Sequence, residues 1–116
     1  MRVLGIDPGT GRLGWAVVEK KAGIEKLLDC GCIETAARTD LSARLEIIYN
    51  ELTRIIHQYL PEEASVEELF FAANRKTVMS VAAARGVALL ACQLAKIKIN
   101  HYTPLQIKSS LTGYGG

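Results

Sequence analysis

Several features that would place this chain in a specialised class of protein are scarce or missing. The sequence has three cysteines among 116 residues and no apolar run long enough to cross a bilayer. An odd number of cysteines without a framework spacing argues against a small secreted disulfide-bonded domain. Cys30 and Cys32 lie two residues apart without a second Cys or His pair, which is a poor zinc signal. We therefore expect a cytoplasmic protein with buried, reduced thiols, no signal peptide and no membrane association.

Acidic residues are missing from the last part of the sequence. Glu68 is the last acidic residue. The charged residues after it are all basic: Arg75, Lys76, Arg85, Lys96, Lys98 and Lys108. The net charge is only +2, but this half is basic and suits a phosphate-rich partner. The alternative is that these charges solvate helix faces. With 49% apolar and 22% charged residues, the composition is that of one globular domain.

The first strand and the turn after it carry the first candidate site. Residues 3–6 form a short apolar run that predicts a buried strand. Asp7 follows, and a carboxylate there is costly to bury, so we expect it to face a cleft, a metal or a cation. Pro8–Gly9 breaks the strand, and Gly9, Gly11 and Gly14 let backbone or ligand come close to Asp7. The alternative is a hairpin in which these residues only make the turn.

The rest of the chain predicts alternating strands and helices. Strands are expected at residues 14–19, at 24–35 with a bulge at Gly31, at 62–69 and at 97–102. Helices are expected from an Asp40 N-cap to Tyr59 before Pro61, over 76–96, and briefly from Pro104. The 76–96 helix is rich in small residues, which suits close packing in the core or a dimer seam.

A second acidic segment, residues 62–68, suggests a metal site. If residues 62–69 pair in parallel with the first strand, Glu67 lies beside Asp7. Two neighbouring carboxylates repel unless a cation bridges them, and hard oxygen ligands suit Mg²⁺. The alternative is one solvated acidic patch. Phe70 and Phe71 follow directly, where an exposed aromatic could stack on bases or anchor the loop in the core. His101 is a metal or acid–base candidate, or a structural residue.

The chain contains four distinctive segments in this order: LGIDPGT at residues 4–10, SVEELFF at 65–71, ARGVA at 84–88 and YTPLQIK at 102–108. Together they resemble the RuvC family of Holliday junction resolvases, which have an RNase H-like α/β fold. Residues 4–10 are similar to that family's opening strand and turn. Residues 65–71 resemble its second acidic segment, 84–88 its central helix, and 102–108 its fifth strand and following helix. The resemblance covers nearly the whole chain and implies a mixed five-stranded sheet flanked by helices.

The resemblance also implies a function and its residues. It implies a homodimeric endonuclease that resolves four-way DNA junctions in recombination and repair by nicking two opposed strands. Asp7 and Glu67 would be metal ligands for Mg²⁺ or Mn²⁺, with Lys108 as a third catalytic residue at the scissile phosphate. We expect DNA contacts from Phe70, Phe71, Arg75, Lys76 and Lys108. The implied partners are the junction, a second copy of the chain, and the branch-migration helicase complex of RuvA and RuvB.

The sequence departs from that family in one respect. The family completes its site with two further acidic residues on a C-terminal helix, whereas no Asp or Glu follows Glu68. We therefore expect residues 1–116 to be a C-terminally truncated RNase H-like resolvase domain, with weak Mg²⁺ binding and little or no cleavage. The alternatives are a YqgF-type nuclease of RNA processing, half of an actin-like nucleotide-binding fold, and a non-catalytic DNA-binding or dimerisation module.

Overall fold

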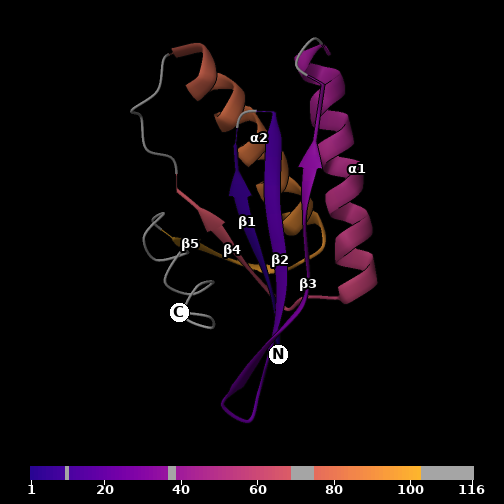
Figure 1. Ribbon diagram of the computed structural model, residues 1–116, viewed down its shortest axis with the longest axis vertical. Helices are drawn as coiled ribbons and strands as arrows, with labels where there is room; N and C mark the ends of the chain where they lie inside the picture. The colour runs from indigo at the N-terminus through magenta and orange to yellow at the C-terminus, as the bar shows by residue number, and fades with distance from the viewer. Residues whose placement is uncertain (10, 37–38, 69–74, 103–116) are drawn as a thin grey trace.

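Within the residues that the structure describes, the fold is a five-stranded sheet with two long helices, and Figure 1 shows their arrangement. The computed structural model describes residues 1–9, 11–36, 39–68 and 75–102. In chain order the elements are β1 (Arg2–Pro8), β2 (Arg12–Lys21), β3 (Ile24–Glu34), α1 (Leu41–Tyr59), β4 (Glu63–Glu67), α2 (Arg75–Leu94) and β5 (Lys98–Tyr102). All seven were predicted, with boundaries that differ by a few residues. The short helix expected from Pro104 lies outside the described residues.

The sheet is mixed, as predicted, and its strand order is β3-β2-β1-β4-β5. β1, β2 and β3 form an antiparallel meander through short turns. β4 then pairs in parallel with β1, and β5 in parallel with β4, because a helix precedes each of them and carries the chain back. β1 therefore lies at the centre, between an antiparallel and a parallel neighbour.

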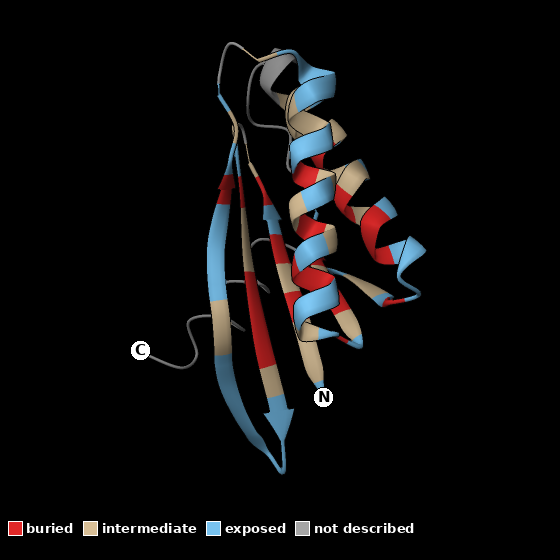
Figure 2. Ribbon diagram, turned by 90° about the vertical axis from the view of Figure 1, so that its right-hand side faces the viewer, coloured by how far each residue is buried: buried red, intermediate tan, exposed pale blue. Residues whose placement is uncertain are grey.

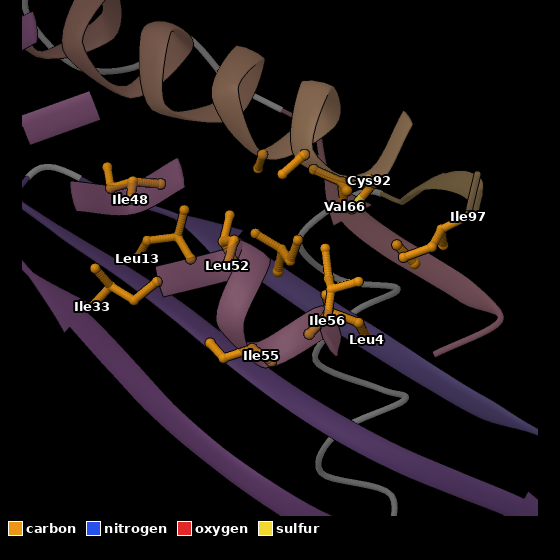
Figure 3. Close-up of a cluster of buried hydrophobic side chains, with 14 of the residues drawn as sticks. Leu4, Leu13, Ile33, Ile48, Leu52, Ile55, Ile56, Val66, Cys92 and Ile97 are labelled. Atoms are coloured by element: carbon orange, nitrogen blue, oxygen red, sulfur yellow. The ribbon is translucent and has the colours of Figure 1, made fainter. Parts of the chain in front are cut away.

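Both helices cover the same face of the sheet (Figure 2). The apolar stripe of α1 includes Ile48, Leu52, Ile55 and Ile56, all buried. It packs on the buried side chains of the strands and of α2, among them Leu4, Leu13, Ile33, Val66 and Cys92 (Figure 3). In the part of the chain that the structure describes, no helix covers the opposite face. Nor is any helix there long and apolar enough to cross a membrane.

Helix α1 begins after Asp40 and ends at Tyr59, as predicted, but its N-terminal cap lacks the expected side-chain bond. Asp40 occupies the N-cap position, but its side chain makes no capping hydrogen bond. At the other end, Leu60 adopts a left-handed conformation with a φ of 50°, and its N–H donates to the Ile56 carbonyl. This bond satisfies one of the last helix carbonyls, and Pro61 then prevents continuation.

The predicted bulge at Gly31 is wrong. The register between β2 and β3 shifts between Val17 and Val18, which leaves Leu28 as the extra residue. Gly31 has another reason to be glycine, because a Cβ there would lie 3.0 Å from the ring of Trp15. The Trp15 ring in turn lies 6.4 Å from that of Tyr59 on α1, measured between ring centroids.

The expectation of buried thiols holds for one cysteine only. Cys92 is fully buried in the core, and this burial raises the pKa of its thiol to about 11. Cys30 and Cys32 are exposed, because β3 is an edge strand and they project from the sheet face that carries no helix. All three cysteines are free thiols.

Candidate active site

Glycines shape the turn after β1, and Asp7 belongs to the strand rather than to the turn. The Gly9 N–H donates to the Arg12 carbonyl at 2.9 Å, and a Cβ on Gly9 would come equally close to that oxygen. Gly11 has a φ of 72°, which favours glycine. Asp7 itself pairs with Gly14 in the β1–β2 ladder. The alternative that Asp7 only makes the turn is therefore not supported by the geometry.

Asp7 and Glu67 come to the same end and the same face of the sheet. The parallel register pairs Ile6 of β1 with Val66 of β4, and each acid is the next residue along its strand. Because Ile6 and Val66 point into the core, strand alternation turns both acids to the face without helices. Asp7 is exposed and Glu67 is half-buried. The predicted juxtaposition is confirmed, and the role of the two acids as metal ligands stays a prediction.

A groove of about 340 Å³ runs from Asp7 across this open face. Its lining is mostly apolar and comes from β1, β2 and β3: Gly5, Ile6, Asp7, Gly14, Trp15, Ala16, Leu27, Cys30 and Gly31. Gly14 adds no side chain beside Asp7, so one flank of the carboxylate stays open. Within the described residues, Asp7 makes no hydrogen bond or ion pair that would neutralise it.

The four glutamates of residues 62–68 do not form one patch. Glu63 lies at the start of β4, where its carboxylate accepts from Asn100 Nδ2 at 3.2 Å and faces Lys98 Nζ at 3.7 Å. Glu67 lies at the other end of the same strand. The alternative of a single solvated acidic patch is therefore wrong, because the strand separates these two side chains.

The basic residues after Glu68 are also divided among different roles. Lys98 pairs with Glu63, far from Asp7 along the sheet. Arg85, in the middle of α2, donates from Nε to the Glu67 carbonyl at 3.0 Å, and its Nη2 lies 2.7 Å from His101 Nδ1. A guanidinium only donates, so His101 Nδ1 accepts. This contact favours the structural role for His101.

Arg85 is the site-adjacent residue whose role the sequence did not reveal. It stands among small residues in a helix, and only the register of β4 and β5 brings two acceptors within its reach.

Of the remaining predicted site residues, the structure describes the backbone of two. Arg75 and Lys76 open α2, which begins at the same end of the molecule as the carboxyl ends of β1 and β4 (Figure 1). Phe70, Phe71 and Lys108 lie outside the described residues.

An antiparallel meander of three strands is extended by the parallel strands β4 and β5. With Asp7 near the end of β1 and Glu67 at the end of β4, this arrangement defines an RNase H-like fold. The yeast mitochondrial Holliday junction resolvase Ydc2 has the same fold. It superposes with a TM-score of 0.68 at 12% identity, over 98% of this chain and 55% of that one.

Closer relatives identify the family. A family model described as crossover junction endodeoxyribonuclease RuvC matches residues 3–116. The crossover junction endodeoxyribonuclease RuvC of Roseiflexus sp. (strain RS-1) is 50% identical over 115 residues, which cover 99% of this chain and 68% of the relative. The structure of T. thermophilus RuvC in complex with Holliday junction substrate is 33% identical, with a TM-score of 0.85 over 100% of this chain and 71% of that one. The chain belongs to the RuvC family.

Proposed function

We propose that this chain is a metal-dependent, structure-specific endonuclease domain that acts on four-way (Holliday) DNA junctions. Its reaction is symmetric phosphodiester hydrolysis in recombination and repair. The observation that carries the proposal is the placement of Asp7 and Glu67 side by side at the open face of a RuvC-family sheet. T. thermophilus RuvC, which this chain resembles at a TM-score of 0.85, has been solved with Holliday junction substrate.

The two acids fit a hard divalent cation. Mg²⁺ binds oxygen ligands, keeps several waters, and needs only one or two protein carboxylates. Asp7 is exposed beside an open groove, so a hydrated ion and a phosphate have access to it. Among the described residues no group of three or more His, Cys, Asp or Glu side chains could hold a metal. We therefore propose Asp7 and Glu67 as the ligands of a weak Mg²⁺ or Mn²⁺ site.

Each site residue has a role in hydrolysis. A divalent ion held by these acids would supply an activated water and charge relief at the leaving oxygen. Asp7 and Glu67 would hold and orient that ion. Lys108 is proposed to neutralise the charge that develops on the scissile phosphate.

The proposed junction contacts combine aromatic and basic side chains. Phe70 and Phe71 follow Glu67 closely in the chain, so bases that they stack on would lie near the cleaved bond. Arg75 and Lys76 would bind the flanking phosphates by charge. As further partners we propose the RuvA and RuvB helicase complex, in the cytoplasm.

An exposed stripe on α2 suits a homodimer. Its members lie three or four residues apart on the outer side of the helix: Met79, Ala82, Gly86, Leu90 and Leu94. Met79, Leu90 and Leu94 are each more than half exposed. A Cβ on Gly86 would meet nothing within 4 Å, which leaves room for a second backbone. A two-fold dimer through this stripe would present two sites to the two opposed strands of a junction.

The dimer proposal has a direct test. Leu90→Glu should give monomers in sedimentation, whereas Ile47→Glu, on the exposed side of α1, should leave the dimer intact. Ala84 is unsuitable for this test, because it is buried in the core at 4% exposure and faces away from the stripe. A Leu90→Glu protein that stays dimeric would place the interface elsewhere.

The function itself is tested with a synthetic four-way junction. The chain is incubated with Mg²⁺ and the junction, or with a linear duplex of the same sequence, and gels report both shift and nicking. We expect a shift that prefers the junction, with nicking weak and abolished by Asp7→Asn. Equal binding of junction and duplex, or robust nicking by Asp7→Asn, would contradict the proposal.

A second candidate function is a DNA-binding and dimerisation module without catalysis. The observation that favours it is that, among the described residues, two carboxylates, those of Asp7 and Glu67, come together at the site. A junction-selective shift without any nicking, at high Mn²⁺ as well as Mg²⁺, would select this reading.

A further inference from the structure

Arg85 ties together the ends of two strands of the sheet. It extends from the third turn of α2 and is half-buried. Its Nε donates to the main-chain carbonyl of Glu67 at 3.0 Å, and its Nη2 donates to His101 Nδ1 at 2.7 Å. One guanidinium thus bridges the last residue of β4 and the penultimate residue of β5, two neighbouring parallel strands.

The two acids of the site are held in place by different neighbours. Pairing between β1 and β4 ends at Ile6 and Val66, so Asp7 and Glu67 both lie one residue beyond that ladder. Asp7 remains fixed on its other side, because the β1–β2 ladder continues through Asp7 to Pro8. Glu67 is at the very end of β4, where its remaining strand partner is Tyr102, the last residue of β5.

The bond from Arg85 acts on the backbone at this strand end. The peptide plane after Glu67 cannot rotate without breaking the bond to its carbonyl oxygen. The pleat of β4 therefore persists to its last residue, and the direction of the Glu67 side chain toward the open face is kept. The donors of a planar guanidinium have a fixed relative geometry. The bond from Arg85 Nη2 to His101 therefore holds the end of β5 in place relative to the end of β4.

We propose that Arg85 is a positioning residue, which holds Glu67 in the orientation needed beside Asp7 through the Glu67 carbonyl and His101. This inference rests on the proposed function, since it assumes that Glu67 is a metal ligand. It predicts that Arg85, although it points to the helix-covered side of the sheet, controls metal affinity on the opposite face.

A double-mutant cycle on Mn²⁺ affinity tests this role. Mn²⁺ is titrated into the chain, and its free EPR signal gives the dissociation constant for wild type, Arg85→Ala, Glu67→Gln and the double variant. Loss of a group that orients a ligand typically costs 10- to 100-fold in affinity, so we expect about a tenfold loss for Arg85→Ala. In the Glu67→Gln background, Arg85→Ala should cause no further loss, because it acts through Glu67.

Two further variants separate positioning from general damage. Arg54→Ala removes an exposed arginine from α1, where it pairs with Glu51 at 3.1 Å, and should bind Mn²⁺ as wild type does. Arg85→Lys keeps the positive charge and a group that can donate, but not the planar fork of the guanidinium, and should lose less affinity than Arg85→Ala.

The outcomes distinguish this inference from the function on which it rests. Wild-type affinity in both Arg85→Ala and Arg85→Lys, or the same loss in both backgrounds, would overturn the positioning role and leave the metal site intact. If Glu67→Gln itself bound Mn²⁺ as tightly as wild type, Glu67 would not be a ligand, and both proposals would fall.

Discussion

The two faces of this sheet are built for different purposes. On one face α1 and α2 bury a continuous apolar core, in which Leu52 and Ile55 are fully inaccessible. The other face carries Asp7 and Glu67 at one end and a groove lined mostly by glycine and apolar residues. Leu27, at the rim of that groove, is 52% exposed. The same strands supply both faces, because successive side chains alternate.

This division separates stability from chemistry within each strand. In β1, Leu4 and Ile6 stabilise the fold, whereas Gly5 and Asp7 shape the site. A substitution on the covered face should therefore change the free energy of unfolding, and a substitution on the open face should change binding. The following predictions test that separation, beginning with the largest effect.

The largest loss of stability is expected from the core of α1. Ile55→Ala removes a fully buried side chain and should lower the free energy of unfolding by about 2–5 kcal/mol through lost transfer energy and a cavity. Ile47→Ala, on the same helix but 41% exposed, should change it by less than about 0.5 kcal/mol. Urea unfolding measures both. Equal losses would show that α1 does not bury the face described above.

A pair of glycines in neighbouring parts of the sheet sharpens the comparison. Gly31→Ala places a methyl group 3.0 Å from the Trp15 ring and should cost roughly 1–3 kcal/mol through overpacking. Gly5→Ala places its methyl group on the open face, 3.8 Å from the nearest atom. It should be neutral or stabilise by up to about 1 kcal/mol, because alanine loses less entropy on folding. The thermal midpoints of the two variants should therefore move differently, and a greater loss for Gly5→Ala would reverse the assignment of the faces.

A smaller change in the free energy of unfolding is expected when pH is raised, because of a hydrogen bond at the edge of the covered face. The hydrogen bond that Tyr59 donates to Asp29, together with burial, raises the pKa of Tyr59 above its usual value of 10.0. Since the unfolded chain loses this proton first, the contribution is present below the unfolded pKa and is lost as pH rises through the folded pKa. Wild type should therefore lose more stability than Tyr59→Phe when urea unfolding is compared at about pH 8 and about pH 11. Identical losses would mean that the bond does not form in solution.

Much of this architecture is predictable from the sequence, because its local signals agree with one another. The apolar run of β1 and the helical spacing from Leu41 to Tyr59 each indicate one element, and Pro61 marks the end of that helix. Placing Glu67 beside Asp7 required only that β4 return in parallel to β1, which short connections favour. Family resemblance then supplied the function that the acids alone could not specify.

The features that the sequence did not predict all depend on how the helices and strands pack against one another. Gly31 is needed because Trp15 from another strand lies over it, and Leu28 takes the bulge. The exposure of Cys30 and Cys32 follows from the position of β3 at the sheet edge. Arg85 gained a role only when α2, β4 and β5 came together, and the exposed stripe of α2 differs from the buried residues Ala84 and Ala88 only in helical phase.

The position of the metal on the open face is tested most directly by mapping Mn²⁺ on the isotopically labelled chain, from the paramagnetic broadening of its backbone amides. If the open face holds the metal, substoichiometric Mn²⁺ should broaden the amides around Asp7 and Glu67 first, and Asp7→Asn should abolish this pattern. Broadening centred on Glu63 at the other end of β4, or a pattern that survives Asp7→Asn, would contradict the assignment of the active site.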